Sequence, residues 1–156
     1  MSEKIKFDVQ NNGNVSTVLI QGAIDEDFTT SFLQDVTGES IVFDFQNLTL
    51  INSCGIREWI RLIENLNGKQ ITYSKCPKIL IDQVNMVEGF FPDYCKIDTF
   101  YAPYYSEDKD EEVDVLLNVS EVGDDLKAPS RKDESSQEEL EFDDIEAQYF
   151  AFIKRN

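Results

Sequence analysis

The sequence contains no histidine and only three cysteines. Without histidine the chain lacks the commonest general base, cannot form a Ser-His-Asp triad and offers zinc no imidazole ligand. Cys54, Cys76 and Cys95 include no pair at metal-ligand spacing, and an odd number of isolated thiols fits a reducing compartment. A glycine-rich phosphate loop and a readable pair of catalytic carboxylates are also missing. We therefore expect a cytoplasmic protein that is not an enzyme and holds no metal or cofactor.

Basic residues are also few, 14 against 31 acidic ones, which gives a net charge of −17. Binding to nucleic acid or to an anionic membrane requires basic patches, so we expect neither partner. No stretch approaches the roughly 20 apolar residues of a membrane span, and the first ten residues lack the apolar core of a signal peptide. The charge favours solubility and basic partners.

The charge is unevenly distributed and suggests two parts. Residues 1–103 hold most of the periodic apolar runs and carry a net charge of −6, whereas residues 104–156 carry −11. We assign residues 1–103 to a folded domain and residues 104–156 to an acidic extension. Such an extension is more often a solvated, partly disordered segment than a dedicated binding arm.

Hydrophobic periodicity predicts alternating strands and helices in the first part. The run 41–45, IVFDF, is typical of a central strand buried on both faces. The helix that follows has Ile56, Trp59, Ile60 and Ile63 on one stripe, so Trp59 is expected in the core. Strands are predicted at 4–10, 15–21, 41–45, 70–74 and 94–102, and helices at 27–36, 53–66 and 77–87. The fold class is therefore α/β, a mixed sheet of four to five strands covered by helices.

Beyond residue 103 the pattern weakens. A strand or half a hairpin is predicted at 112–119, and residues 120–138 show no periodicity. Residues 143–154 predict a short terminal helix that is acidic at its start and basic at its end. Its apolar face consists of Ile145, Tyr149, Phe152 and Ile153.

The start of the helix at 53–66 is the candidate functional surface. A helix N-terminus presents unpaired N–H groups and a partial positive charge, and Ser53 is expected to lie there, exposed. A phosphate on its hydroxyl would add roughly −1.5 to −2 charges and repel a docked partner. The alternative is that Ser53 or Asn52 only caps the helix.

Three segments resemble the STAS family, which includes the bacterial anti-sigma-factor antagonists. They are GAID at 22–25, IVFDFQNLTLINSCGI at 41–56 and KILIDQVNMVEGFFPDYCKIDTF at 78–100, and the resembling part, residues 1–103, covers about two thirds of the chain. The resemblance implies a STAS-like fold and makes Ser53 the candidate phosphate acceptor. It implies a protein partner, a kinase-like anti-sigma factor or related regulator. The expected partner surface consists of Gly22, Asp25, Asn52, Cys54, Gly55 and Arg57.

Several of these residues depart from the family pattern or have a second interpretation. Asn52 replaces the motif's aspartate and Cys54 its second serine or threonine, whereas Gly55 matches. Cys54 is either a reactive thiol at a helix start or, more often, a small packed side chain. Asp25 is either close to Ser53 or simply a turn residue. Arg57, like most helical arginines, is either part of the docking surface or only solvated.

The extension resembles a small ribbon appended to some STAS proteins. In such relatives we expect Cys-x-x-Cys pairs near 105–108 and 132–137, but these stretches read YYSED and KDESSQ here. The resemblance therefore implies a degenerate ribbon without metal. A competing function is a constitutive scaffold that binds a partner through the acidic extension and the apolar face of the terminal helix.

Overall fold

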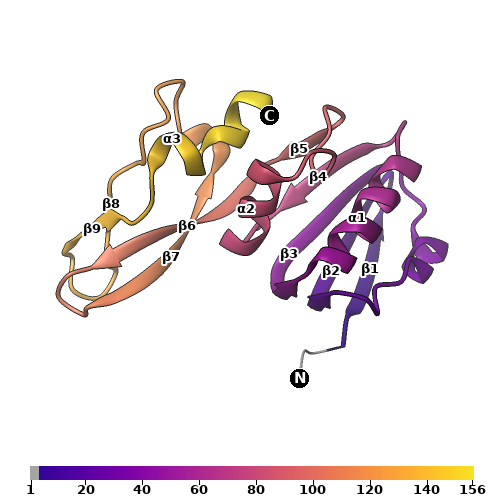
Figure 1. Cartoon of the computed structure of the whole chain (residues 1–156), viewed down its shortest axis with the longest axis horizontal. Helices are drawn as coiled ribbons and strands as arrows, with labels where there is room; N and C mark the ends of the chain where they lie inside the picture. Colours follow the sequence, from indigo (N-terminus) through magenta and orange to yellow (C-terminus); the bar gives the residue numbers. More distant parts are fainter. Residues whose placement is uncertain (1–3) are drawn as a thin grey trace.

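The computed structural model describes residues 4–156 and contains two β-sheets (Figure 1). The first three residues of the predicted 1–103 domain lie outside the described part. The first sheet has five strands in the order β1-β2-β3-β4-β5, and the second has four in the order β7-β6-β9-β8. The architecture is mixed α/β, as the sequence predicted.

The first sheet is built from a hairpin and three parallel additions. Its strands are β1 (Lys6–Asn12), β2 (Val15–Ile24), β3 (Ser40–Ile51), β4 (Gln70–Ser74) and β5 (Cys95–Ile97). Strands β1 and β2 pair antiparallel, and the other neighbours pair parallel. The turn of the hairpin contains Gly13 at φ +62°, the left-handed conformation that glycine adopts without steric cost.

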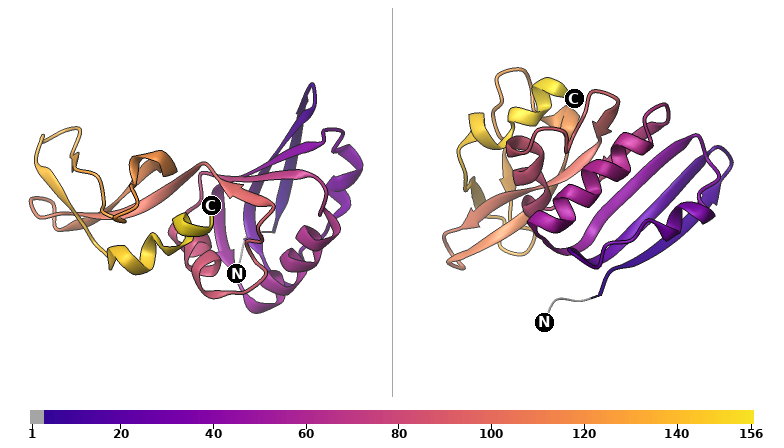
Figure 2. Two further views of the ribbon diagram at one scale, coloured as in Figure 1. Left: turned by 90° about the horizontal axis from the view of Figure 1, so that it is seen from above. Right: turned by 45° about the vertical axis from the view of Figure 1, so that its right-hand side comes forward.

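Helices α1 (Ser53–Asn65) and α2 (Lys78–Met86) and the 3-10 helix η1 (Ser31–Asp35) lie on one face of this sheet (Figure 2). Ile41, Phe43 and Phe45 of β3 point to that face and are buried. Val42 and Asp44, on the other face, are only half-buried. The expectation that this strand is buried on both faces was therefore wrong, because helices cover one face alone.

The centre of the core is a hydrogen-bonded group of aromatic residues. Trp59 of α1 is fully buried, as predicted, and its Nε1 donates to the hydroxyl of Tyr73 on β4 at 3.0 Å. That hydroxyl donates in turn to the carbonyl of Phe90 at 2.8 Å. The indole N–H of Trp59 and the hydroxyl of Tyr73 thus both have hydrogen-bond partners, which offsets their loss of contact with water. The pair fixes α1 against the middle of the sheet.

Two predictions for the part of the chain between the hairpin and α1 differ from the structure. The helix expected at 27–36 is the shorter η1, which buries Phe32 against Phe7 of β1 with ring centroids 4.3 Å apart. Asp27 does not cap it, because η1 begins only at Ser31 and its N-cap residue is Thr30. The loop expected after residue 45 is strand, since β3 continues along β2 to Ile51 through two register irregularities.

The strand predicted at 94–102 divides between the two sheets. Asp98 separates β5 from β6 (Thr99–Ser106), and its carboxylate accepts a hydrogen bond from the amide of Thr99 at 2.6 Å. Strand β6 passes through residue 103, the expected boundary, and enters the second sheet. The remaining elements are β7 (Glu111–Asn118), η2 (Val119–Glu121), β8 (Arg131–Lys132), β9 (Glu139–Phe142), α3 (Glu146–Tyr149) and η3 (Ala151–Arg155).

The acidic extension is folded, and its C-terminal turns pack beside α2 (Figures 1 and 2). Tyr149 and Phe152 are buried around Phe100 of β6, and Asn85 of α2 donates to the carbonyl of Tyr149 at 2.9 Å. The expectation of a solvated, partly disordered segment was wrong, because these aromatic side chains complete a core that continues into the first sheet. The face expected to bind a partner is therefore largely occupied by the chain itself.

Candidate functional site

The first turn of α1 begins as the sequence predicted, at Ser53. Asn52 is the N-cap, with extended backbone angles, and its Oδ1 accepts a hydrogen bond from the amide of Gly55 at 2.9 Å. The carbonyl of Asn52 accepts the first helical hydrogen bond, from Ile56, at 2.9 Å. Asn52 thus performs the capping role, so Ser53 is not required for it.

Ser53 and Cys54 are exposed side by side at this helix start. The serine hydroxyl is accessible to solvent and to another protein. The preferred interpretation of Cys54, a packed side chain, was wrong, because its thiol is exposed while Gly55 takes the inward position. Arg57, one turn further along the helix, is also exposed.

Gly55 sets how closely α1 approaches the sheet. A Cβ at this position would lie 2.0 Å from the carbonyl oxygen of Ile24 and 2.8 Å from the amide nitrogen of Asp25. Both are backbone atoms at the end of β2, so they cannot move aside as a flexible side chain could. The same end of β2 accepts a hydrogen bond from the amide of Asn52 at 3.2 Å. The glycine therefore allows the helix start to rest directly on β2.

The other residues of the expected partner surface lie in the first turn of α1 or in the end of β2 and the residue that follows it. Gly22, Asp25 and Gly55 are all buried, so a docked partner cannot contact them directly. Gly22 adopts φ +96° where the pairing of β2 with β3 is irregular. The Asp25 carboxylate accepts a hydrogen bond from the amide of Asp27 at 2.9 Å. These residues shape the site, whereas Asn52, Ser53, Cys54 and Arg57 present it.

A negative charge contacts residue 52 although that residue is itself neutral. The side-chain amide of Asn52 donates to the carboxylate of Glu26 at 2.9 Å. An aspartate at position 52 would repel Glu26, so the asparagine is compatible with an acidic neighbour that comes from another element. Sequence reasoning missed Glu26, because only the fold brings the chain after β2 next to the start of α1.

The surface around the site is mixed in character. Leu50, near the end of β3, is 42% exposed, and a single exposed leucine is an ordinary feature of a protein surface. Arg61 pairs with Glu58 at 3.0 Å on the exposed side of α1, and an ion pair of this kind contributes little to stability. We define the α1 surface as Leu50, Asn52, Ser53, Cys54 and Arg57.

The two hairpin turns expected to carry cysteine pairs in relatives contain an ion pair instead. Lys109, between β6 and β7, contacts the Asp133 carboxylate, between β8 and β9, at 2.9 Å. Hydrogen bonds from the Ser135 hydroxyl and the Lys109 ammonium, with those from nearby backbone amides, hold the pKa of Asp133 well below its ordinary range. Within residues 4–156, no cluster of three or more cysteine, aspartate or glutamate side chains could hold a metal ion.

The other two cysteines lie inside the protein. Cys76 and Cys95 are fully buried, and burial raises the pKa of both thiols, that of Cys95 to about 12. Neutral buried thiols behave as small apolar side chains rather than as nucleophiles. Cys54 is therefore the thiol open to solvent among the three.

No protein-family model matches the chain, and no curated protein shows significant similarity to it. No helix in the described part of the chain is both long and apolar enough to cross a membrane.

Proposed function

We propose that the chain is a non-enzymatic, cytoplasmic interaction switch of the STAS type, similar to an anti-sigma-factor antagonist. A protein partner, a kinase-like anti-sigma factor or related regulator, docks on the α1 surface, and phosphorylation of Ser53 releases it. The observation that carries this proposal is the exposed hydroxyl of Ser53 in the first turn of α1, next to an N-cap that already satisfies the helix.

The arrangement of the first sheet supports the comparison with the STAS family. The segment NSCGI, which carries the strongest sequence resemblance, forms the junction of β3 and α1, and GAID ends β2 immediately beneath it. Two of the three resembling segments, far apart in the sequence, therefore meet at one place. Such a meeting is expected if both contribute to a single docking surface.

Phosphorylation would act on this surface through charge. A phosphate adds roughly −1.5 to −2 charges and three acceptor oxygens at pH 7. The N-terminal amides and the dipole of the 13-residue helix α1 can accommodate it locally. Together with the Glu26 carboxylate, which contacts Asn52, it would make the start of α1 strongly negative. A partner that buries this spot would have to desolvate the added charge, so binding weakens without a change of fold.

The alternative function, a scaffold that binds through the terminal helix, is less well supported. Tyr149 and Phe152, the centre of its proposed contact face, are 2% and 0% exposed. A partner could reach them only by displacing α3 and η3 from α2. The α1 surface requires no such rearrangement.

Mapping of covalent phosphate tests the proposed control. The full chain, tagged and recovered from its own cells, is digested and its phosphorylated peptides are sequenced by mass spectrometry. We expect phosphate on Ser53 and its loss in Ser53→Ala. We call residues 4–98, with the first sheet, the first lobe, and residues 99–156, with the second sheet, the second lobe. The exposed Ser120, in the second lobe, serves as control. Phosphate confined to Ser120 or to other sites would show that Ser53 is not the acceptor.

A further inference from the structure

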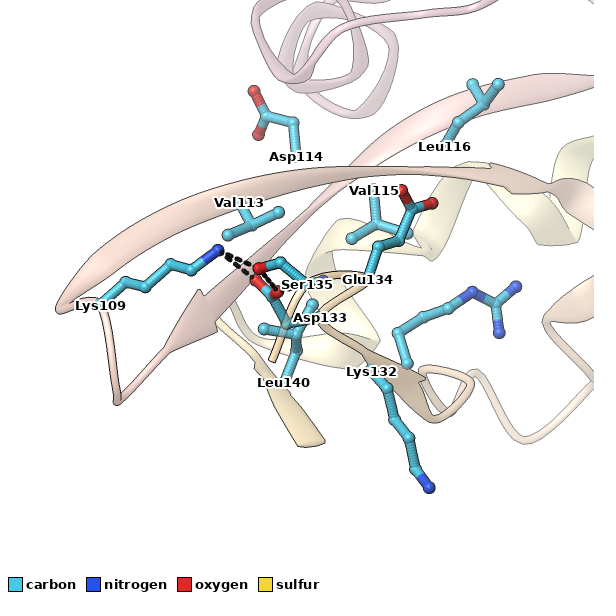
Figure 3. A pocket seen from close by; sticks show the side chains of 11 residues that line it. Lys109, Val113, Asp114, Val115, Leu116, Lys132, Asp133, Glu134, Ser135 and Leu140 are labelled. Carbon is cyan, nitrogen blue, oxygen red and sulfur yellow. Dashed lines mark hydrogen bonds and ion pairs between the residues drawn. The ribbon is translucent and has the colours of Figure 1, made fainter. Parts of the chain in front are cut away.

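An open pocket of about 650 Å³ lies in the second lobe, between the edge strand β7 and the segment that contains β8 (Figure 3). Four consecutive residues of β7, Val113 to Leu116, line it. Successive side chains of a strand point to opposite faces, so four in a row can line one pocket only where it runs along the strand's edge. The pocket therefore borders the backbone of β7.

That edge of β7 is unpaired within residues 4–156. Strand β7 pairs with β6 over eight residues and with no other described strand. Ion pairs stand at both ends of the gap: Lys109, before β7, contacts Asp133, and Glu121, after β7, contacts Arg131 of β8. The two pairs connect the walls of the pocket at its ends and leave its middle open.

The walls of the pocket combine valine and leucine side chains with carboxylates from both sides. Val113 and Val115 point toward the side occupied by Asp133 and Leu140, whereas Asp114 points the other way (Figure 3). Glu111, Glu112 and Asp114 give β7 three carboxylates and no basic residue. On the opposite wall, Arg131 is paired with Glu121, and Lys132 points away from β7 (Figure 3).

We propose that β7 accepts an extended peptide segment of a partner protein as an additional strand. Backbone hydrogen bonds to the free edge would hold the segment, and alternate apolar side chains would enter the pocket beside Val113 and Val115. The intervening side chains would lie beside Asp114 and Glu112, which favours lysine or arginine there. The ligand is thus a strand in which apolar and basic residues alternate.

Charge also argues against a second copy of the chain as the occupant. Two β7 strands placed edge to edge would bring six carboxylates together, and like charges on paired strands are destabilising. A strand that carries lysine or arginine would instead be attracted by the carboxylates of β7. The inference concerns a different lobe from the α1 surface and does not depend on the proposed function.

The test uses two capped seven-residue peptides, one alternating lysine with valine and the other glutamate with valine. Each is titrated into the isotopically labelled full chain while backbone amide shifts are recorded by NMR. We expect saturable binding of the lysine peptide with the largest shifts at residues 113–116, and none of the glutamate peptide. Asp114→Lys should weaken binding about three- to tenfold. Glu88→Lys, an equal charge change at an exposed residue of the first lobe, should alter it much less.

Three results would overturn the proposal. The first is that the lysine peptide produces no saturable shifts within residues 111–118. Equal weakening by Asp114→Lys and Glu88→Lys would reduce the effect to overall charge. Concentration-dependent dimerisation of the chain alone, with protection of the same β7 amides, would assign the edge to a second copy.

Discussion

Substitution of Gly55 by alanine tests how the α1 surface is built. The added Cβ would meet the carbonyl oxygen of Ile24 at 2.0 Å and its carbonyl carbon at 2.4 Å, where comfortable contacts are about 3.5 Å. The start of α1 would have to move away from β2 by roughly 1 Å or more. This movement stretches the hydrogen bond from the Asn52 amide to Ile24, which is already 3.2 Å long.

Two opposing contributions set the magnitude of this effect. Alanine is favoured over glycine inside a helix by about 1 kcal/mol. Overpacking against atoms that cannot rotate away costs about 1–3 kcal/mol and sometimes more, and here three backbone atoms lie within 3 Å. Because the clash involves backbone on both sides, we place the overpacking cost at about 3–4 kcal/mol, which leaves a net loss of about 2–3 kcal/mol. For a chain of this size that corresponds to a decrease in Tm of roughly 4–12 °C.

Thermal unfolding followed by circular dichroism measures this change. Gly123→Ala is the control, because a Cβ there meets only the Asp125 side chain at 3.4 Å and the backbone is not left-handed. We expect the control to stay within about 0.5 kcal/mol of the wild type. A Gly55→Ala variant as stable as the wild type would refute the close packing of α1 on β2.

Three further predictions concern the core and the thiols. Tyr73→Phe should destabilise the protein by about 1–3 kcal/mol in denaturant unfolding, because it leaves the Trp59 Nε1–H and a buried carbonyl without partners. Phe152→Ala should cost about 3–5 kcal/mol, whereas Ile145→Ala, 58% exposed, should cost less than about 1 kcal/mol; equal small effects would indicate that the terminal turns are not docked. A charged thiol reagent should modify Cys54 rapidly in the native protein and the other cysteines only after unfolding; rapid reaction of all three would contradict the burial described.

The elements of the first sheet were largely predictable, because their signals are local. The alternation in the first strand, the turn around Gly13 and the apolar stripe of α1 each depend on neighbouring residues. The start of α1 at Ser53 was confirmed. The length of β3 was not, because residues 46–51 become strand only by pairing with β2 across irregular register. Such pairing is a property of the fold rather than of the segment.

The second lobe shows where composition misleads. Many acidic residues predicted a solvated segment, yet Phe150 and Phe152 lie at 0% exposure in its core. A few aromatic side chains spaced along the chain order it, and its charged side chains other than the buried Asp133 remain at least partly exposed. The contact between Glu26 and Asn52 was equally hidden, because 26 positions separate the two residues in the sequence.

Whether a partner docks over Ser53 is tested by measuring the affinity of the complex that the full chain forms in its own cells. The isolated complex is measured for the wild type, Ser53→Asp, Ser53→Trp and the control Ser120→Asp. We expect at least about a tenfold loss of affinity for both Ser53 variants and none for the Ser120→Asp control. A complex that holds all four variants with equal affinity would contradict it.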